Sequence, residues 1–377
     1  MSITPHFATT AGTERFARRF NYLASDHFRQ RYGLTLSSIG LGTMSGGTQA
    51  VDSQGYVAGI QRAVANGCNV LDTAVNYRFM QSERDIGLAL SNLFNEGLVR
   101  RDELVICTKG GIIPFNDAPH EEREEYLRES IYAANLAQPQ DVAGNVHCLA
   151  PDFLSNQIGV SLNNLRLGTI DVYYIHNPEI QLDYVTPQEF RRRIRAAFAR
   201  LEEEAASGRI RFYGISAQDG LLAAQADRGY LPLSLFVQIA REVGGESHRF
   251  RFVQFPYNLH VLDAVVESNQ VFDTEKDGQK QRLNLPLLAV ARQHALVTVS
   301  STTLDRGKLL GHVPGNIKPI LGDLSSDAQY AIQFNRSTPG LTTTLVGMGS
   351  VEHAIENLAV AQKAIVPPDV FFSMFGR

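Results

Sequence analysis

Short runs of β-branched and apolar residues alternate with longer amphipathic stretches along most of the chain. The short runs predict strands at 37–42, 69–72, 104–109, 170–176, 210–216, 252–255, 296–300 and 343–346. Apolar positions at helical spacing predict helices at 55–66, 83–95, 154–165, 187–207, 218–228, 285–294, 325–335 and 352–363, with one more at 233–243. Strands that alternate strictly with helices predict a parallel sheet covered by helices.

Eight such units in one chain favour a closed barrel over an open sheet, because closure removes both sheet edges. We therefore predict an α/β fold, a (β/α)8 TIM barrel formed as a single domain by residues 34–377, after an N-terminal extension at 1–33. Two segments, 110–151 after the third strand and 259–284 after the sixth, are too long to be simple loops. They begin at the carboxyl ends of strands, where barrel enzymes build their sites, so we expect these active-site loops to shape a substrate pocket.

Composition narrows the functional classes without choosing one. Hydrophobic residues make up 44% of the chain and charged residues 20%, with a net charge of −4, as in an ordinary globular protein with no footprint for nucleic acid. Three cysteines cannot form a disulfide framework, and the adjacent His147 and Cys148 lack a second ligand pair, so we expect no metal site. Without a secretory signal or an apolar run of about 20 residues, we expect a cytoplasmic protein with no membrane partner.

Polar side chains that suit one chemistry follow three consecutive predicted strands. Asp72 ends the second strand and Tyr77 comes five residues later, Lys109 ends the third strand, and His176 ends the fourth. A single residue of this kind is usually a solvated rim or structural residue. Four of them at the same end of a barrel are difficult to assign to chance.

These four side chains together suit the reduction of a carbonyl group. A tyrosine hydroxyl with a pKa near 10 is a poor acid at neutral pH, and a nearby ammonium group lowers that pKa. Asp72 can pair with Lys109 and hold it beside Tyr77, while a neutral His176 can donate a hydrogen bond to the carbonyl oxygen. The hydride must come from a cofactor, since no side chain supplies one.

Several motifs resemble those of aldo-keto reductases over roughly residues 34 to 365. They are Gly40-Leu41-Gly42-Thr43-Met44, the spacing of Asp72, Tyr77 and Glu83, Thr108-Lys109, Tyr174-Ile175-His176-Asn177-Pro178, Tyr213-Gly214-Ile215-Ser216, and the closing Gly347, Ser350 and Asn357. The resemblance implies an NAD(P)-dependent oxidoreductase that transfers a hydride between nicotinamide and a small-molecule aldehyde, ketone, sugar or alcohol. Tyr77 would be the general acid/base, Asp72 and Lys109 would tune it, and His176 would orient the substrate.

The resemblance also implies cofactor contacts. Ser216 and Gln254 would contact the nicotinamide carboxamide. Further contacts would come from Gly42, Thr43, Met44, Asp72, Thr302, Leu304, Arg306, Gly347, Gly349, Ser350, His353 and Asn357. The family usually has Arg or Lys for the 2′-phosphate near Gly349 and His353, so the cofactor is left open between NADP and NAD.

Two further departures from the family pattern keep a second functional class open. Ala217 stands where the family usually has Asn, and Ser301 stands where an aromatic usually stacks on nicotinamide. An aldo-keto-reductase-like regulatory protein that senses a cofactor with little turnover would tolerate both changes. A Rossmann dehydrogenase is disfavoured, because no third glycine opens a helix directly after Gly42.

The substrate itself is not identified by the sequence. Four side chains of the long segments are candidates to face it, although an ordinary loop or helix role is the simpler interpretation of each. They are His120, Tyr126, Tyr132 and His260.

Overall fold

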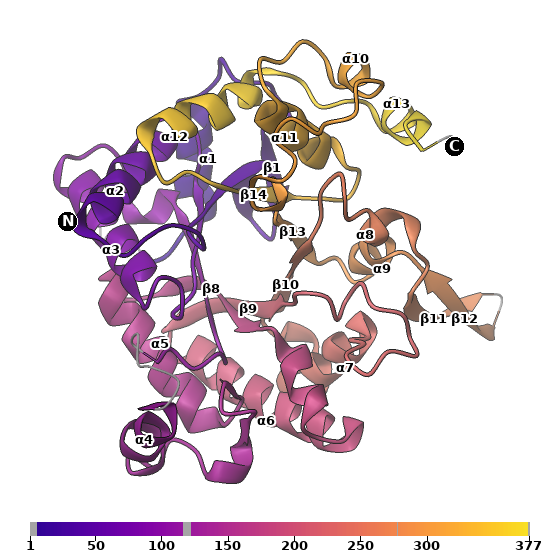
Figure 1. Cartoon of the computed structure of the whole chain (residues 1–377). Helices are drawn as coiled ribbons and strands as arrows, with labels where there is room; N and C mark the ends of the chain where they lie inside the picture. Colours follow the sequence, from indigo (N-terminus) through magenta and orange to yellow (C-terminus); the bar gives the residue numbers. More distant parts are fainter. Residues whose placement is uncertain (1–5, 116–121, 277, 376–377) are drawn as a thin grey trace.

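A computed structural model describes residues 6–115, 122–276 and 278–375 of the chain. Eight parallel strands close into a barrel in the order β10-β13-β14-β3-β4-β5-β8-β9 (Figure 1). Their bounds are β3 Ile39–Gly42, β4 Val70–Asp72, β5 Val105–Gly110, β8 Ile170–His176, β9 Ile210–Ser216, β10 Phe250–Pro256, β13 Val297–Ser301 and β14 Thr343–Gly347. The predicted (β/α)8 barrel is confirmed, and each predicted barrel strand matches an observed one to within two residues at either end.

Helices surround the barrel, and most lie where the apolar spacing predicts them. The larger ones are α2 Ala50–Ala65, α3 Gln81–Asn95, α5 Pro151–Leu165, α6 Pro187–Ala206, α7 Leu233–Gly244, α9 Leu287–Gln293, α11 Asp327–Ser337 and α12 Val351–Leu358. Two short helices, α10 Lys318–Leu321 and α13 Pro368–Ser373, complete the C-terminal part. None of the helices in the described ranges is long and apolar enough to cross a bilayer.

The helix predicted at 218–228 is wrong, since this segment forms a series of turns. The Glu179 carboxylate accepts hydrogen bonds from the backbone N–H groups of Gln218 and Asp219, at 2.5 and 3.1 Å. Backbone groups held by a side chain in this way compete with helix formation. The helix between β9 and β10 is instead α7, which the sequence also predicts.

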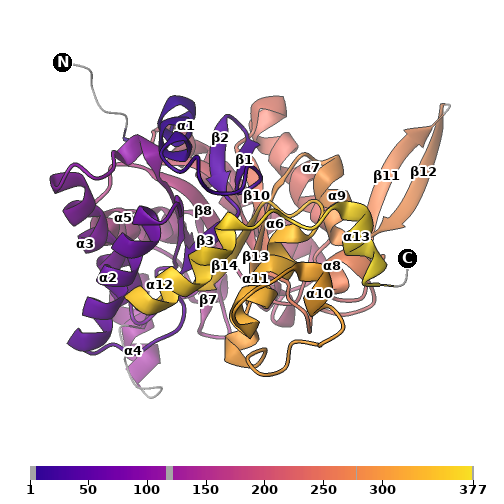
Figure 2. The ribbon, with the colours of Figure 1, turned by 90° about the horizontal axis from the view of Figure 1, so that it is seen from above.

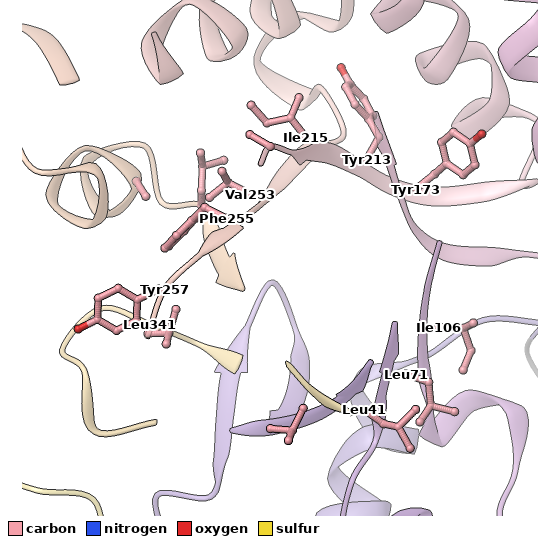
Figure 3. Close-up of a cluster of buried hydrophobic side chains, with 14 of the residues drawn as sticks. Leu41, Leu71, Ile106, Tyr173, Tyr213, Ile215, Val253, Phe255, Tyr257 and Leu341 are labelled. Carbon is pink, nitrogen blue, oxygen red and sulfur yellow. The ribbon is translucent and has the colours of Figure 1, made fainter. Parts of the chain in front are cut away.

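Two apolar layers hold the barrel together. The outer layer lies between the strands and the helices, and Figure 3 shows several of its strand side chains, including Leu41, Leu71, Ile106, Tyr173 and Tyr213. The inner layer fills the barrel with residues from the alternate positions of the same strands, as the twofold repeat of a strand requires: Val70, Val105, Cys107, Val172, Tyr174, Phe212, Phe252, Val297, Val299 and Leu345. All three cysteines are buried as free thiols.

The N-terminal segment covers the end of the barrel at which the strands begin. It contains α1 Thr10–Arg18 and the strand β1 Phe28–Arg31, which pairs with β2 Leu34–Ser37 in an antiparallel ribbon. Figure 2 shows α1, β1 and β2 lying together on one side of the barrel. Ala8, Leu34 and Leu36 of this segment join the inner apolar layer, so they act as a plug. The opposite end, where the strands finish, is therefore the open one.

The two long connections form small structures of their own. The one after β5 contains α4 Arg123–Tyr126, a helical turn at Leu127–Tyr132, and the short antiparallel strands β6 Val142–Ala143 and β7 His147–Cys148. The one after β10 contains α8 Asp263–Val266 and a hairpin of β11 Gln270–Lys276 and β12 Gln279–Leu285, which projects from the barrel (Figure 1).

Candidate active site

A cavity of about 340 Å³ opens where the barrel strands end. It is lined by residues that end β3, β4, β8, β9, β10, β13 and β14 or directly follow them. Its walls include Gly42, Thr43, Met44, Ser45, Asp72, Tyr77, His176, Asn177, Ser216, Ala217, Gln218, Gln254, Pro256, Ser301, Thr302, Thr303, Leu304, Arg306, Gly307, Leu345, Val346 and Gly347. Three of the four residues singled out at strand ends, Asp72, Tyr77 and His176, thus face one space.

Lys109, the fourth of these residues, lies behind the cavity wall and is fully buried. Its Nζ donates to an Asp72 carboxylate oxygen and, at 2.7 Å, to the backbone oxygen of Thr73. Burial lowers the pKa of Lys109, but the charge and hydrogen bond of Asp72, together with smaller contributions from neighbours such as Tyr77, outweigh burial, so that the pKa is raised overall. The ammonium group therefore stays charged at neutral pH.

Tyr77 lies directly over this ion pair. The Nζ of Lys109 is 4.9 Å from the centre of the Tyr77 ring. Burial raises the pKa of Tyr77 above its ordinary value, and the charge of Lys109 offsets this rise only in part. The ammonium group thus lowers the pKa of Tyr77, as the sequence predicts, but the net shift in the chain alone is upward because desolvation of the phenolate is the larger effect.

A strained turn fixes the position of Tyr77. The next three residues, Arg78, Phe79 and Met80, all have left-handed backbone conformations, with φ of 48°, 54° and 66°. Such conformations are costly for residues other than glycine and persist only where the surroundings hold them. Arg78 supplies this hold through Asp85, at 2.7 Å, and the backbone oxygen of Gly47, at 2.6 Å.

His176 stands beside Tyr77, with ring centres 5.6 Å apart and an edge-on arrangement. Burial, with the nearby charge of Lys109, lowers the pKa of His176 well below its ordinary value. Its Nδ1 is buried and has no hydrogen-bond partner among the residues that the structure describes. The imidazole is therefore neutral at neutral pH, as expected from the sequence.

Ser216 and Gln254, the residues expected to contact a carboxamide, are joined to the ion pair. Ser216 Oγ donates to Gln254 Oε1 at 2.8 Å, and Gln254 Nε2 donates to an Asp72 oxygen at 2.9 Å. The Asp72 carboxylate is thus held on one side by an ammonium group and on the other by an amide.

The sequence-predicted cofactor residues divide into two groups. Ten of them line the cavity: Gly42, Thr43, Met44, Asp72, Ser216, Gln254, Thr302, Leu304, Arg306 and Gly347. Gly349, Ser350, His353 and Asn357 do not line it. Ser350 instead caps α12 by accepting the His353 N–H at 3.2 Å, and Asn357 donates to the Gly347 backbone oxygen at 3.3 Å.

Several wall residues were not predicted from the sequence. Gln218, Thr303 and Gly307 follow strand ends without a role expected from the sequence, and Asn177 lies in the motif that ends β8 but had no role assigned to it. The described parts of the long segments 110–151 and 259–284 do not line the cavity, and neither do Tyr126, Tyr132 or His260. His120 lies outside the described residues. No cluster of three or more metal-ligating side chains occurs in the described ranges.

Comparison with known proteins assigns the chain to a family. The model of the aldo/keto reductase family matches residues 38–240, which is more than half of the chain. An NADH-specific methylglyoxal reductase of Escherichia coli (strain K12) is 30% identical over 191 residues, which cover 49% of this chain and 50% of that protein. The chain thus matches about half the length of this curated relative.

Solved structures agree on the fold. An aldo/keto reductase from Klebsiella pneumoniae, solved with NADP and acetate, has a TM-score of 0.58 at 19% identity and covers 93% of this chain and 96% of its own. A glycerol dehydrogenase from Gluconobacter oxydans has a TM-score of 0.62 at 18% identity, covering 94% and 95%. The chain, with its eight-stranded barrel and its match to the family model, belongs to the aldo/keto reductase family.

Proposed function

We propose that this protein is an NAD(P)-dependent oxidoreductase that interconverts a small carbonyl compound and its alcohol. The observation that carries the proposal is the convergence of Tyr77, His176 and the buried pair of Asp72 and Lys109 at one cavity. This set combines a proton donor, a neutral hydrogen-bond donor and a buried positive charge, which is what carbonyl reduction requires.

Each residue has a separate role in this proposal. Tyr77, held as a neutral phenol by its raised pKa, donates its proton to the carbonyl oxygen during reduction and takes it back during oxidation. Lys109 stabilises the phenolate that this transfer leaves, and Asp72 keeps the ammonium group charged and in place. His176, neutral at working pH, donates a hydrogen bond that orients the substrate oxygen.

The cavity residues fit a nicotinamide nucleotide, which would supply or accept the hydride. Cβ atoms on Gly307 and Gly347 would meet no protein atom within 4 Å, so the backbone is open to close approach there. Arg306 lines the cavity and forms no ion pair with another described residue, so its charge is available to a phosphate. Ser216 and Gln254 would hold the carboxamide.

Selectivity between the two nucleotides is part of the proposal. Without Arg or Lys at Gly349 and His353, we propose that the chain discriminates weakly between NADPH and NADH. The relative from Escherichia coli is named as NADH-specific, which agrees with a site that does not need the 2′-phosphate. Titration of both reduced nucleotides by fluorescence tests this point. A preference for NADPH above roughly a hundredfold, about 2.7 kcal/mol, would contradict it.

The competing function is a cofactor-sensing protein with little turnover, which the presence of Ser301 in the cavity wall favours. The deciding experiment measures cofactor oxidation by wild type and Tyr77→Phe with a panel of aldehydes, ketones and sugars. We expect turnover by wild type on at least one compound and its near-complete loss in the variant. Cofactor binding without turnover on any compound would support the sensor instead.

A further inference from the structure

His147, which the sequence marks only as a neighbour of Cys148, is fully buried behind the cavity. It lies in β7 of the long connection after β5, and an isolated bridge pairs it with Ile112. Its ring is seated against Gly111, where a Cβ atom would stand 3.0 Å from His147 Nε2. Gly111 has a φ of 111°, which disfavours a side chain at this position on backbone grounds as well.

Both ring nitrogens of His147 are hydrogen-bonded. Nε2 lies 2.7 Å from the backbone oxygen of His176, and Nδ1 lies 2.8 Å from Gln181 Nε2. A backbone oxygen can only accept and an amide NH2 group can only donate. The contacts are therefore satisfied by one form, the neutral imidazole with its proton on Nε2.

The orientation of Gln181 is fixed from the other side. Arg193 on α6 donates to Gln181 Oε1 at 2.7 Å, and because a guanidinium only donates, the Gln181 NH2 group must face His147. Arg193 is held in turn by Glu189, at 2.9 Å, and by the backbone oxygen of Gln140, at 2.6 Å. A directed series of donors thus runs from Arg193 through Gln181 and His147 to the backbone of His176.

This series ends at the residue proposed to orient the substrate. Directly after His176 the backbone turns left-handed at Asn177, with φ of 47°, and the Asn177 N–H donates to the Ser216 backbone oxygen at 2.7 Å. The carbonyl of the same peptide unit, that of His176, is fixed by its hydrogen bond with His147 Nε2. The His176 imidazole makes no side-chain hydrogen bond through Nδ1 within the described residues, so its backbone carries much of its positioning.

We infer that His147 is a positioning residue for His176: through its Nε2–H it fixes the strand end that aims the substrate-orienting imidazole into the cavity. Gln181 and Arg193 set the direction of that hydrogen bond. The inference rests on the proposed oxidoreductase function for its kinetic consequence, but the hydrogen bond itself can be tested without turnover. It also gives the connection after β5 a role at the site although its described residues do not line the cavity.

Two conservative substitutions separate the two ring nitrogens. Gln in place of His147 presents its amide near the former Nε2 and can still donate to the His176 oxygen. Asn presents its amide near the former Nδ1, so that it keeps the contact with Gln181 and loses the one with His176. We expect H147N to lower kcat/KM for the best carbonyl substrate of the panel by about tenfold at saturating cofactor, and H147Q to stay within about threefold of wild type.

A structural role alone would not produce this difference. Each variant loses one buried hydrogen bond, so we expect similar falls in melting temperature, and we expect the Kd for NADH and NADPH to change by less than about twofold in both. Equal kcat/KM in H147N and H147Q, or activity that simply follows melting temperature, would overturn the inference.

Histidine-selective 15N NMR on the full chain tests the same hydrogen bond without any substrate. We expect a slowly exchanging Nε2 proton on His147 in wild type, and His176 resonances that shift in H147N but not in H147Q. His176 signals that are unmoved in H147N would overturn the inference even if wild type turned over. Absence of turnover in wild type with the expected NMR pattern would instead reject only the proposed function.

Discussion

The two ends of the barrel each bury a carboxylate beside a cation, but they use these charges differently. At the end covered by the N-terminal segment, Asp171 accepts from Ala8 N, at 2.7 Å, from Arg101, at 2.7 Å, and from Ile106 N, at 2.9 Å. All of these partners belong to the chain itself, and an apolar plug lies beside them. The polar groups at this end therefore stabilise the fold.

At the open end, several buried polar atoms near the pair of Asp72 and Lys109 have no hydrogen-bond partner among the described residues. These atoms are Thr73 Oγ1, Asn76 Oδ1 and His176 Nδ1. At the covered end one atom of the pair itself, Arg101 Nε, also lacks a partner among the described residues. Unsatisfied buried groups cost stability, so three of them at the open end, one belonging to the cavity wall, indicate a site arranged for something other than folding. Whether a buried ion pair serves the fold or a site thus depends on the groups that surround it.

The largest effect should come from breaking the pair at the open end. Lys109→Met removes the charge that favours the Tyr77 phenolate, so the pKa of Tyr77 should rise further and kcat/KM should fall by about a thousandfold. Because Asp72 is left as an unpaired buried charge, the free energy of unfolding should also fall, by roughly 3–5 kcal/mol.

The double variant Asp72→Asn/Lys109→Met sharpens this prediction, because it removes both charges. We expect urea unfolding to show that much of the lost stability returns while turnover remains absent. Recovery of activity in the double variant would contradict the role assigned to Lys109.

Breaking the pair at the covered end should affect folding instead. Asp171→Asn keeps the shape of the side chain but leaves Arg101 without its ionic partner, so we expect the free energy of unfolding to fall by about 3 kcal/mol. The value of kcat/KM for the folded protein should stay within about threefold of wild type. A large loss of turnover with unchanged urea unfolding would contradict the distinction between the two ends.

Acid should destabilise both ends through buried histidines. Burial lowers the pKa of His147 to about 4 and that of His27 to about 3, below the ordinary value near 6.5. The native protein therefore binds fewer protons than the unfolded chain in this range. Its stability is fully present above about pH 6.5 and falls as the pH is lowered, by about 1.4 kcal/mol per pH unit for each histidine.

Urea unfolding between pH 7 and pH 5 measures this slope. His27, which contacts Ser38 Oγ and the Gly67 backbone oxygen, belongs to the covered side of the fold. His27→Gln should flatten the slope by the contribution of one histidine, whereas an unchanged slope would show that His27 is not held neutral.

The smallest effect should come from removing the charge of Arg306, the exposed arginine of the cavity wall. Arg306→Met should weaken binding of NADH and NADPH by about tenfold in fluorescence titration, with a weaker dependence on salt, because one charge-assisted contact to phosphate is lost. Lys308→Met is a matched control, since Lys308 is exposed nearby but does not line the cavity. Equal losses in the two variants would indicate only a general electrostatic effect.

The barrel could be predicted from sequence because its signal is local. Each strand is an apolar run and each helix an amphipathic stretch, so β8 and β9 agree residue for residue with the prediction. The prediction failed at 218–228, where Glu179, about forty residues earlier, takes the backbone N–H groups of Gln218 and Asp219. No local pattern reports a partner so distant in sequence.

The sequence predicted those site residues that lie at the ends of strands. It did not predict those that depend on contacts with residues far away in the sequence. Asp72, Lys109 and His176 are found by their position alone, because parallel strands bring their carboxyl ends together. His147 depends on Gln181 and Arg193, 34 and 46 positions further along, and the sequence singled it out only as a neighbour of Cys148 at which no metal site was expected. The balance between burial and charge at Tyr77 needed coordinates for the same reason.

The proposal depends most on proton transfer by Tyr77, and the single-turnover rate of hydride transfer tests this step directly. Wild type and Tyr77→Phe should be compared at saturating NADH or NADPH with the best carbonyl substrate, after cofactor binding has been measured for both. We predict equal cofactor affinity and a rate at least about a thousandfold lower in Tyr77→Phe. A Tyr77→Phe protein that binds cofactor and transfers hydride within about tenfold of the wild-type rate would contradict the account.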